Sequence, residues 1–265
     1  MRANRAPPRC PGVANALHGK VVKLRIPMAG TLALAFMALA LPGCRPFASA
    51  ARGPALGQAA PSLQAVLPYL RAARFPLYLP DRLPAPPPGD SYFFTAHATS
   101  GSYEVTFHFT NHPTPVNGTA VSSWPAYIGL VRGGPAAWVE QQAATQDGVV
   151  FPQPSGTPTQ ITLPGGLAAV LYPAGAVRWE NGGWRYGVSA DSAADAMHIA
   201  ATMVGMFGPS GSPVGPGVHG EVLRAFGADG GNSAVLWTVG GRAYEVWGRD
   251  ANAFTLVKDL VRVRT

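Results

Sequence analysis

The chain has 265 residues, a net charge of +7, and only 12% charged residues. Residues 1–43 hold six of the 20 basic residues and none of the 13 acidic ones, so the remainder is nearly neutral at +1. Because that remainder also lacks a cluster of Lys or Arg, we exclude nucleic acid as a partner.

The N-terminal segment has the order of a secretory signal. An apolar run, Ile26 to Leu41, follows basic residues and ends at Pro42-Gly43, directly before Cys44. A cysteine after such a run resembles the lipobox of bacterial lipoproteins. The resemblance implies that residues 1–43 are removed and that Cys44 carries a diacylglycerol with palmitate-type chains. The basic residues closest to the run are Lys20, Lys23 and Arg25.

An uncleaved membrane anchor is the alternative for this segment. A spanning helix needs roughly 20 apolar residues, whereas this run is shorter and is interrupted by Pro27 and Gly30. The cleaved signal is therefore favoured. With Cys44 lipidated, no cysteine remains for a disulfide or a metal site.

The composition divides the chain into five parts. Residues 1–43 are the signal peptide, and residues 44–61 have no hydrophobic period and predict a flexible tether. Residues 62–207 predict an α+β domain. The Gly/Pro-rich residues 208–217 predict a linker, and residues 218–265 predict a second ββα repeat packed on the first domain.

The first half of the domain shows mainly strand patterns. Ser62 is expected to cap a short helix, and the prolines of residues 75–84 favour an extended segment docked on a sheet edge. The alternating patterns then predict four strands in two hairpins, followed by a polar loop over 145–158. These strands are Tyr92–Ala98, Tyr103–Thr110, Tyr127–Val131 and Ala136–Gln142.

A repeated pattern marks the second half. Residues 177–188 match residues 235–246 at Val, Trp, both glycines, Tyr and Val, with a constant offset. The glycine pairs are expected in hairpin turns. The first copy ends a predicted meander (167–172, 177–180, 184–189) and leads into a helix that Ser192 caps and that ends at Phe207. The second copy leads into a helix that carries Phe254, Val257, Leu260 and Val261. The pattern predicts a duplicated ββα unit.

Two stretches resemble a family of uncharacterised domains in secreted and membrane-anchored proteins of spore-forming bacteria. The first is Phe75-Pro76-x-Tyr78-x-Pro80-x-x-Leu83-Pro84; the second combines Val177-x-Trp179, Tyr186 and Ile199-Ala200. The resemblance implies an α+β fold, a curved antiparallel sheet with helices packed on one face. It implies no catalytic residues.

The residues themselves predict no catalytic, cofactor-binding or metal site. His97, His108 and His112 are the nearest approach to a metal cluster, but His108 and His112 would lie about 13 Å apart along a continued strand, and only a sharp turn at Asn111 would bring them together. The acidic residues are scattered. Trp179 and Trp237 recur in the repeat and are expected in the core. Trp138 and Trp247 do not recur, and Trp247 is either an exposed stacking platform or part of a second packed layer.

These observations predict a lipoprotein on the extracytoplasmic face of the cell membrane, anchored through Cys44. We expect a non-catalytic role in which the domain binds an envelope glycan or protein, or assembles envelope components, without a cofactor. The alternative is an envelope hydrolase. A pocket with two carboxylates, or with His and Ser, favours the hydrolase, and an aromatic groove without a titratable pair favours binding.

Overall fold

A computed structural model describes residues 57–118, 126–145, 155–208, 211–215, 217–227 and 230–263. The expected signal peptide, Cys44 and most of the expected tether lie outside these ranges, as does most of the 145–158 loop. No helix in the described part is long and apolar enough to cross a membrane.

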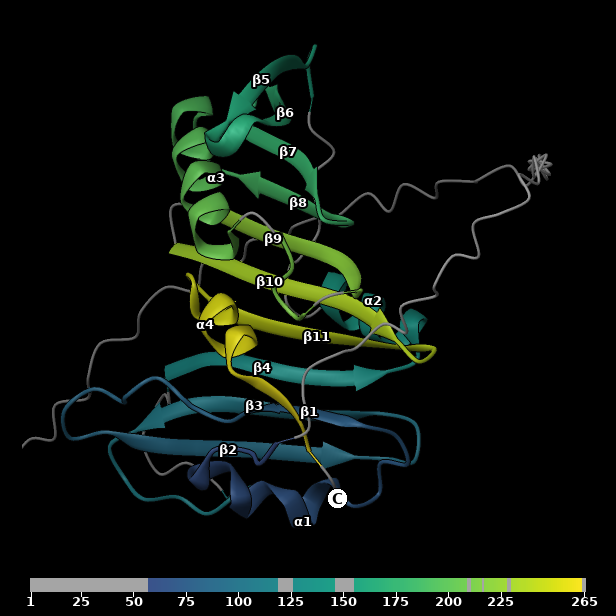
Figure 1. The fold of residues 1–265 in the computed structure, drawn as a ribbon. Helices are drawn as coiled ribbons and strands as arrows, with labels where there is room; N and C mark the ends of the chain where they lie inside the picture. The colour runs from purple at the N-terminus through teal and green to yellow at the C-terminus, as the bar shows by residue number, and fades with distance from the viewer. Residues whose placement is uncertain are drawn as a thin grey trace, which may run out of the picture. The chain divides into compact units, whose positions relative to one another are not determined.

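Ten strands form one curved sheet, so the expected α+β class is confirmed (Figure 1). Their spatial order is β2-β3-β4-β11-β10-β9-β8-β7-β6-β5, and all neighbours are antiparallel except β8 and β9. The strands are β2 (Ser91–Ala98), β3 (Tyr103–Thr110), β4 (Ala126–Gly134), β5 (Thr159–Leu163), β6 (Leu167–Tyr172), β7 (Ala176–Asn181), β8 (Trp184–Ser189), β9 (His219–Gly227), β10 (Gly230–Val239) and β11 (Arg242–Arg249).

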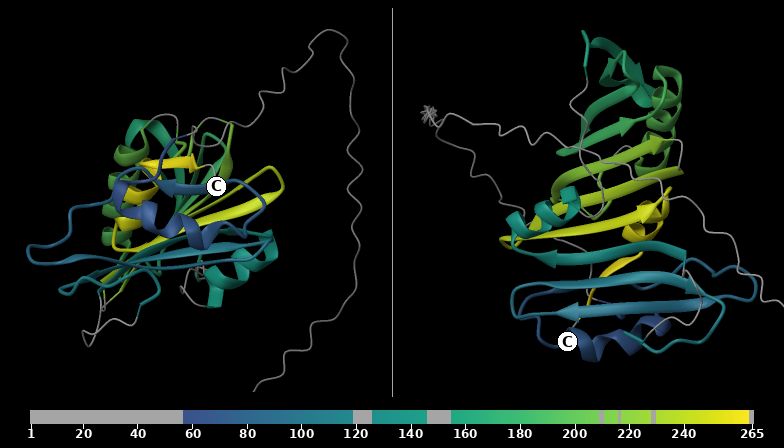
Figure 2. Two further views of the ribbon diagram at one scale, coloured as in Figure 1. Left: turned by 90° about the horizontal axis from the view of Figure 1, so that it is seen from below. Right: turned by 180° about the vertical axis from the view of Figure 1, so that it is seen from behind.

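Helices lie on both faces of this sheet (Figures 1 and 2). α3 (Ala193–Phe207) and α4 (Asn252–Lys258) cover what we call the core face, as expected. α2 (Ala136–Thr145) packs on β4 and β11 from the opposite side, which we call the α2 face. Short helical turns complete the fold: η1 (Pro61–Val66), α1 (Leu67–Leu70) and η2 (Pro164–Gly166).

The proline-rich segment contains β1 (Leu77–Pro80). It pairs with β12 (Leu260–Val263) in a separate two-stranded sheet, rather than with an edge of the large sheet as expected. On its other side, the Tyr78 backbone N–H donates to the Tyr103 hydroxyl at 3.0 Å, and that hydroxyl donates to the Tyr78 carbonyl at 3.1 Å. Burial raises the pKa of Tyr103, so the hydroxyl keeps the proton it donates.

The folded unit begins earlier than the expected tether boundary at residue 61. The Gly57 N–H donates to the Arg262 carbonyl, and Ala59 and Ala60 are buried. The first helical turns also start two residues early. Ala60, not Ser62, precedes η1, whose first position is a proline suited to helix starts.

Two expected elements differ in type. Residues 136–142 form the helix α2 instead of a strand, because Pro135 is well placed at a helix start and the Ala- and Gln-rich residues that follow favour helix. Val139 and Ala143, four residues apart, are its buried positions. Leu260 and Val261 leave the second expected helix, which stops at Lys258, and belong to β12.

Other expectations are confirmed. β3 has the expected bounds and buries Tyr103, Val105 and Phe107 in alternation. The Ser192 hydroxyl caps α3 by accepting from the Asp195 N–H at 3.1 Å. β5 and β9 are strands that the sequence analysis did not assign.

The two copies of the repeat form hairpins with the same register. Trp179 faces Tyr186 in β7–β8, and Trp237 faces Tyr244 in β10–β11, with ring centroids 4.9 and 5.5 Å apart. Both turns are Gly-Gly pairs with positive φ, the backbone that a two-residue hairpin turn requires. The elements that follow differ, since α3 leads to β9 in the same sheet and α4 leads to β12 in the other.

No boundary interrupts the sheet at the expected linker. β8, before the linker, pairs in parallel with β9, after it, and Val214 of the linker is buried. The described segments on both sides of residues 208–217 therefore belong to one unit.

The tryptophans of the repeat are core residues, as predicted: Trp179 is 5% exposed and Trp237 is 2% exposed. Trp247 is also buried and belongs to a second packed layer on the α2 face, with Leu130, Leu223 and Ala234. Trp247 is therefore not an exposed stacking platform.

Replacing either repeat tryptophan by alanine should destabilise the protein by about 3–5 kcal/mol, because each leaves a large cavity in the core. Tyr69→Ala is the control, since Tyr69 is 46% exposed, and it should change stability by less than about 0.5 kcal/mol. Urea denaturation measures both effects. Unchanged midpoints for Trp179→Ala and Trp237→Ala would contradict the core assignment.

Candidate functional site

A row of facing residues crosses eight neighbouring strands. Residues that face one another in the register of a sheet project from the same face, and Arg132, Glu245 and Leu236 place this row on the face that α2 covers. The row consists of His97, Leu236 and two Glu-Arg-Glu triplets, one on each side of Leu236. From β2 to β7 its residues are His97, Glu104, Arg132, Glu245, Leu236, Glu221, Arg185 and Glu180.

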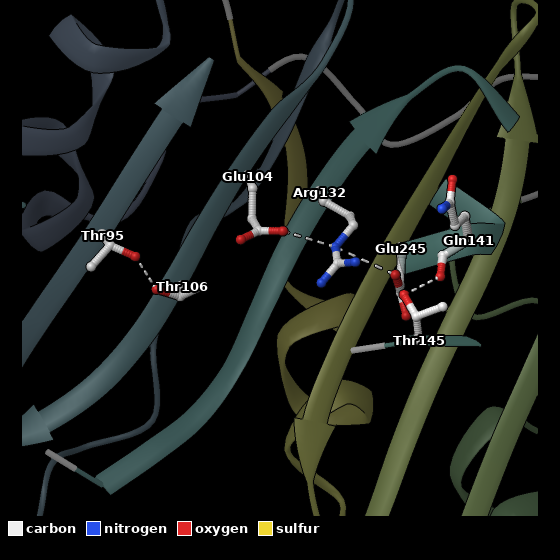
Figure 3. Close-up of polar contacts among 7 residues, drawn as sticks. All are labelled: Thr95, Glu104, Thr106, Arg132, Gln141, Thr145 and Glu245. Carbon is white, nitrogen blue, oxygen red and sulfur yellow. Dashed lines mark hydrogen bonds and ion pairs between the residues drawn. The ribbon is translucent and has the colours of Figure 1, made fainter. Parts of the chain in front are cut away.

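The first triplet is largely buried, with 28% of the Glu104 side chain exposed. The Arg132 Nε lies 3.2 Å from Glu104 Oε2 and 3.5 Å from Glu245 Oε2, and the side chains of Arg132 and Glu245 are completely buried (Figure 3). Helix α2 packs on β4 and β11, the strands that carry these two residues. We call Glu104, Arg132 and Glu245 the covered triplet.

Burial makes the charges of the covered triplet interdependent. Removing charged groups from water costs several kcal/mol per ion, which only close opposite charges and hydrogen bonds offset. One guanidinium lies between two carboxylates here, so Arg132 compensates both. Without Arg132, the completely buried Glu245 would lose this compensation.

The second triplet is open. The Arg185 guanidinium forms an ion pair with the Glu221 carboxylate, although the Arg185 side chain is 68% exposed. Glu180 faces Arg185 from β7 and is also exposed. We call Glu180, Arg185 and Glu221 the open triplet.

Two grooves flank the open triplet, and all three of its residues line both of them. The first, of about 660 Å³, reaches Gln160, Ala168, Val170 and Arg178 on β5–β7. The second, of about 700 Å³, reaches Val139 and Glu140 of α2, and also His219, Leu236 and Thr238. We call the surface from α2 to β5 the open half of the α2 face.

The histidines considered as metal ligands are not gathered. His97 and His112 are exposed, and His108 is half-buried with its Nε2 3.2 Å from the Thr106 hydroxyl. Burial lowers the pKa of His108, which favours its neutral form. In the described part of the chain, no three His, Cys, Asp or Glu side chains are placed to hold a metal ion. Trp138 of α2, which also lies outside the repeat, is half-buried and lines a smaller groove with His97 and Glu104.

The sequence analysis missed the charged row. It treated the acidic residues as scattered, yet Glu104 and Glu245, 141 residues apart, contact the same arginine. The alternation of β3 did place Glu104 on the face opposite the core. No local sequence pattern indicated which residues would face Glu104 from the neighbouring strands.

Arg132→Ala should destabilise the fold by about 3–5 kcal/mol, because it leaves a buried carboxylate without its cation. Arg185→Ala removes the central arginine of the open triplet and serves as the matched control. Its exposed pair is expected to contribute about 0–1 kcal/mol. Denaturant unfolding of both variants tests the contrast. Equal losses would show that α2 does not isolate the covered triplet from water.

Comparison with known proteins gives no match. No protein-family model, no curated protein and no solved structure is similar to this chain at a significant level. The geometry of the open half and the pattern of the N-terminal residues are therefore the observations that bear on its function.

Proposed function

We propose that this protein is a lipoprotein anchored to the extracytoplasmic face of the cell membrane, and that its domain binds an envelope protein or glycan without catalysis. The observation that carries the binding role is the open half of the α2 face. Two adjoining grooves surround Glu180, Arg185 and Glu221 there, whereas Arg132 and Glu245 of the covered triplet are completely buried.

The residues of the open half suit recognition of a polar partner. The exposed Arg185 guanidinium offers planar N–H donors, and Glu180 and Glu221 offer acceptors on either side of it. Val170 and Leu236 add apolar surface beside these charges. Such alternation of charges favours specificity and orientation more than high affinity.

The signal pattern that ends at Cys44 supports the lipid anchor. Acyl chains contribute about 0.8 kcal/mol per buried CH₂, so two or three chains hold a nearly neutral protein on a membrane. Without them, a net charge of +1 after residue 43 gives little attraction to anionic lipids.

An envelope hydrolase is the second candidate, because Glu180 and Glu221 line the same grooves. They lie two strands apart, which separates their backbones by about 9–10 Å; inverting glycosidases place two carboxyl groups about 6.5–9.5 Å apart. Against this candidate, Arg185 lies between the two residues and forms an ion pair with Glu221. A carboxylate held in this way is poorly suited to give or take a proton.

Cys44→Ser should move the protein out of the membrane fraction, because no acyl chain is then attached. Cell fractionation and detection of the protein in each fraction measure the change, and Cys10→Ser is the matched control that should leave the distribution unaltered. If Cys44→Ser remains in the membrane, an uncleaved N-terminal helix is the better account.

Purified protein should show no turnover of peptidoglycan, peptide, ester or phosphoester substrates. The screen is repeated with Glu180→Gln and Glu221→Gln, which keep the shape of the grooves and remove one carboxylate each. Turnover by the wild type that either substitution abolishes would establish the hydrolase and overturn the binding role.

A further inference from the structure

We infer that the partner of the open half is a second copy of this chain, in a two-fold pair that places Arg185 of each copy opposite Glu180 of the other. The inference rests on the proposal that the open half is a binding surface. It names the partner of that surface.

The charges of the open triplet are complementary to those of a second copy. Along the open triplet the charge alternates from one strand to the next, negative at Glu180, positive at Arg185 and negative at Glu221. Neighbouring strands are about 4.8 Å apart. A two-fold axis that runs between β7 and β8 therefore places Glu180 of each copy opposite Arg185 of the other. Both pairs have unlike charges, as a self-complementary interface requires.

The covered triplet shows how this chain pairs three charges in the same order, Glu-Arg-Glu. There the central arginine contacts carboxylates from both neighbouring strands. In the open triplet the guanidinium of Arg185 is paired with Glu221, and Glu180 faces it across the ladder. A second copy supplies Glu180 with a guanidinium of its own, so each carboxylate gains an arginine.

Much of the groove surface around the triplet is uncharged, although Arg178 and Glu140 also line it. The groove residues nearest the sheet edge include uncharged ones, Gln160, Ala168 and Val170, and Leu236 and Thr238 lie on the other side. The chain after residue 43 carries a net charge of only +1, and proteins near zero net charge associate more readily. If both copies are held on one membrane by Cys44, their effective concentration rises further.

A charge swap tests the pairing. Full-length chains with two different tags are co-expressed, extracted in detergent and pulled down through one tag; the tagged wild-type chains should recover each other. Arg185→Glu in both copies, or Glu180→Arg in both copies, sets like charges opposite and should reduce recovery by about tenfold. Combining Arg185→Glu in one copy with Glu180→Arg in the other restores both unlike pairs and should restore recovery. Lys258→Glu, on α4 at the core face, is the control for the change in charge.

Failure to recover the wild-type partner at any expression level would overturn the inference. The inference would also be overturned if neither single substitution reduced recovery, or if the combined pair did not restore it. Thermal melting of each variant confirms that the fold persists. These failures remain separate from failure of the proposed function, because a monomer that is anchored through Cys44 and binds isolated envelope glycan or protein would keep that function and lose only the self-pairing.

Discussion

The structure depends on one constraint of β-sheets: residues that face each other across a ladder must project from the same side. In ten registered strands, this constraint sends Trp179, Trp237 and their neighbours into the core, and it sends Arg132 and Glu245 to the other face. The apolar core and the charged row therefore have a common origin. Neither could change register without the other.

The covered triplet adds specificity to this ladder. A slip of one residue between β4 and β11 would carry Arg132 to the core face, away from its carboxylates and into apolar surroundings. Because Glu104, Arg132 and Glu245 come from three adjacent strands, the ion pairs fix two registers together. The apolar residues alone would discriminate less between registers, since valines and tryptophans tolerate several neighbours.

Sequence patterns predicted the elements whose signals are local. The alternation of residues 103–110, the Ser192 cap and the Gly-Gly turns each depend on a few adjacent residues, and all were found. The expected strand at 136–142 was wrong, because its Ala, Trp and Val residues suit a strand as well as a helix and the helix signals of Pro135 and of the Ala- and Gln-rich residues were not given weight. Sheet contacts at Val139 and Ala143 decide for helix.

The candidate site lay beyond local signals altogether. Arg132 meets Glu245 only because β4 pairs with β11, and Arg185 meets Glu221 only because a parallel pair joins β8 and β9 after α3 crosses the core face. Such registers between distant segments follow from the packing of the whole unit. A single sequence provides the charges but does not reveal which of them become neighbours.

The pairing of β1 with β12 has a consequence for the order of folding. Leu77 faces Val263, so this contact joins segments almost 190 residues apart, whereas the hairpins β2–β3 and β7–β8 close over a few residues. Contacts between distant segments form slowly, because the entropy of closing a long loop is lost before the contact gains energy. β1 can therefore obtain its partner only once the chain has been synthesised as far as Val263. Until then Leu77 and Leu79, fully buried in the finished fold, lack that cover. The early hairpins can form long before β1 pairs with β12. In that interval the chain is most exposed to proteolysis and to aggregation.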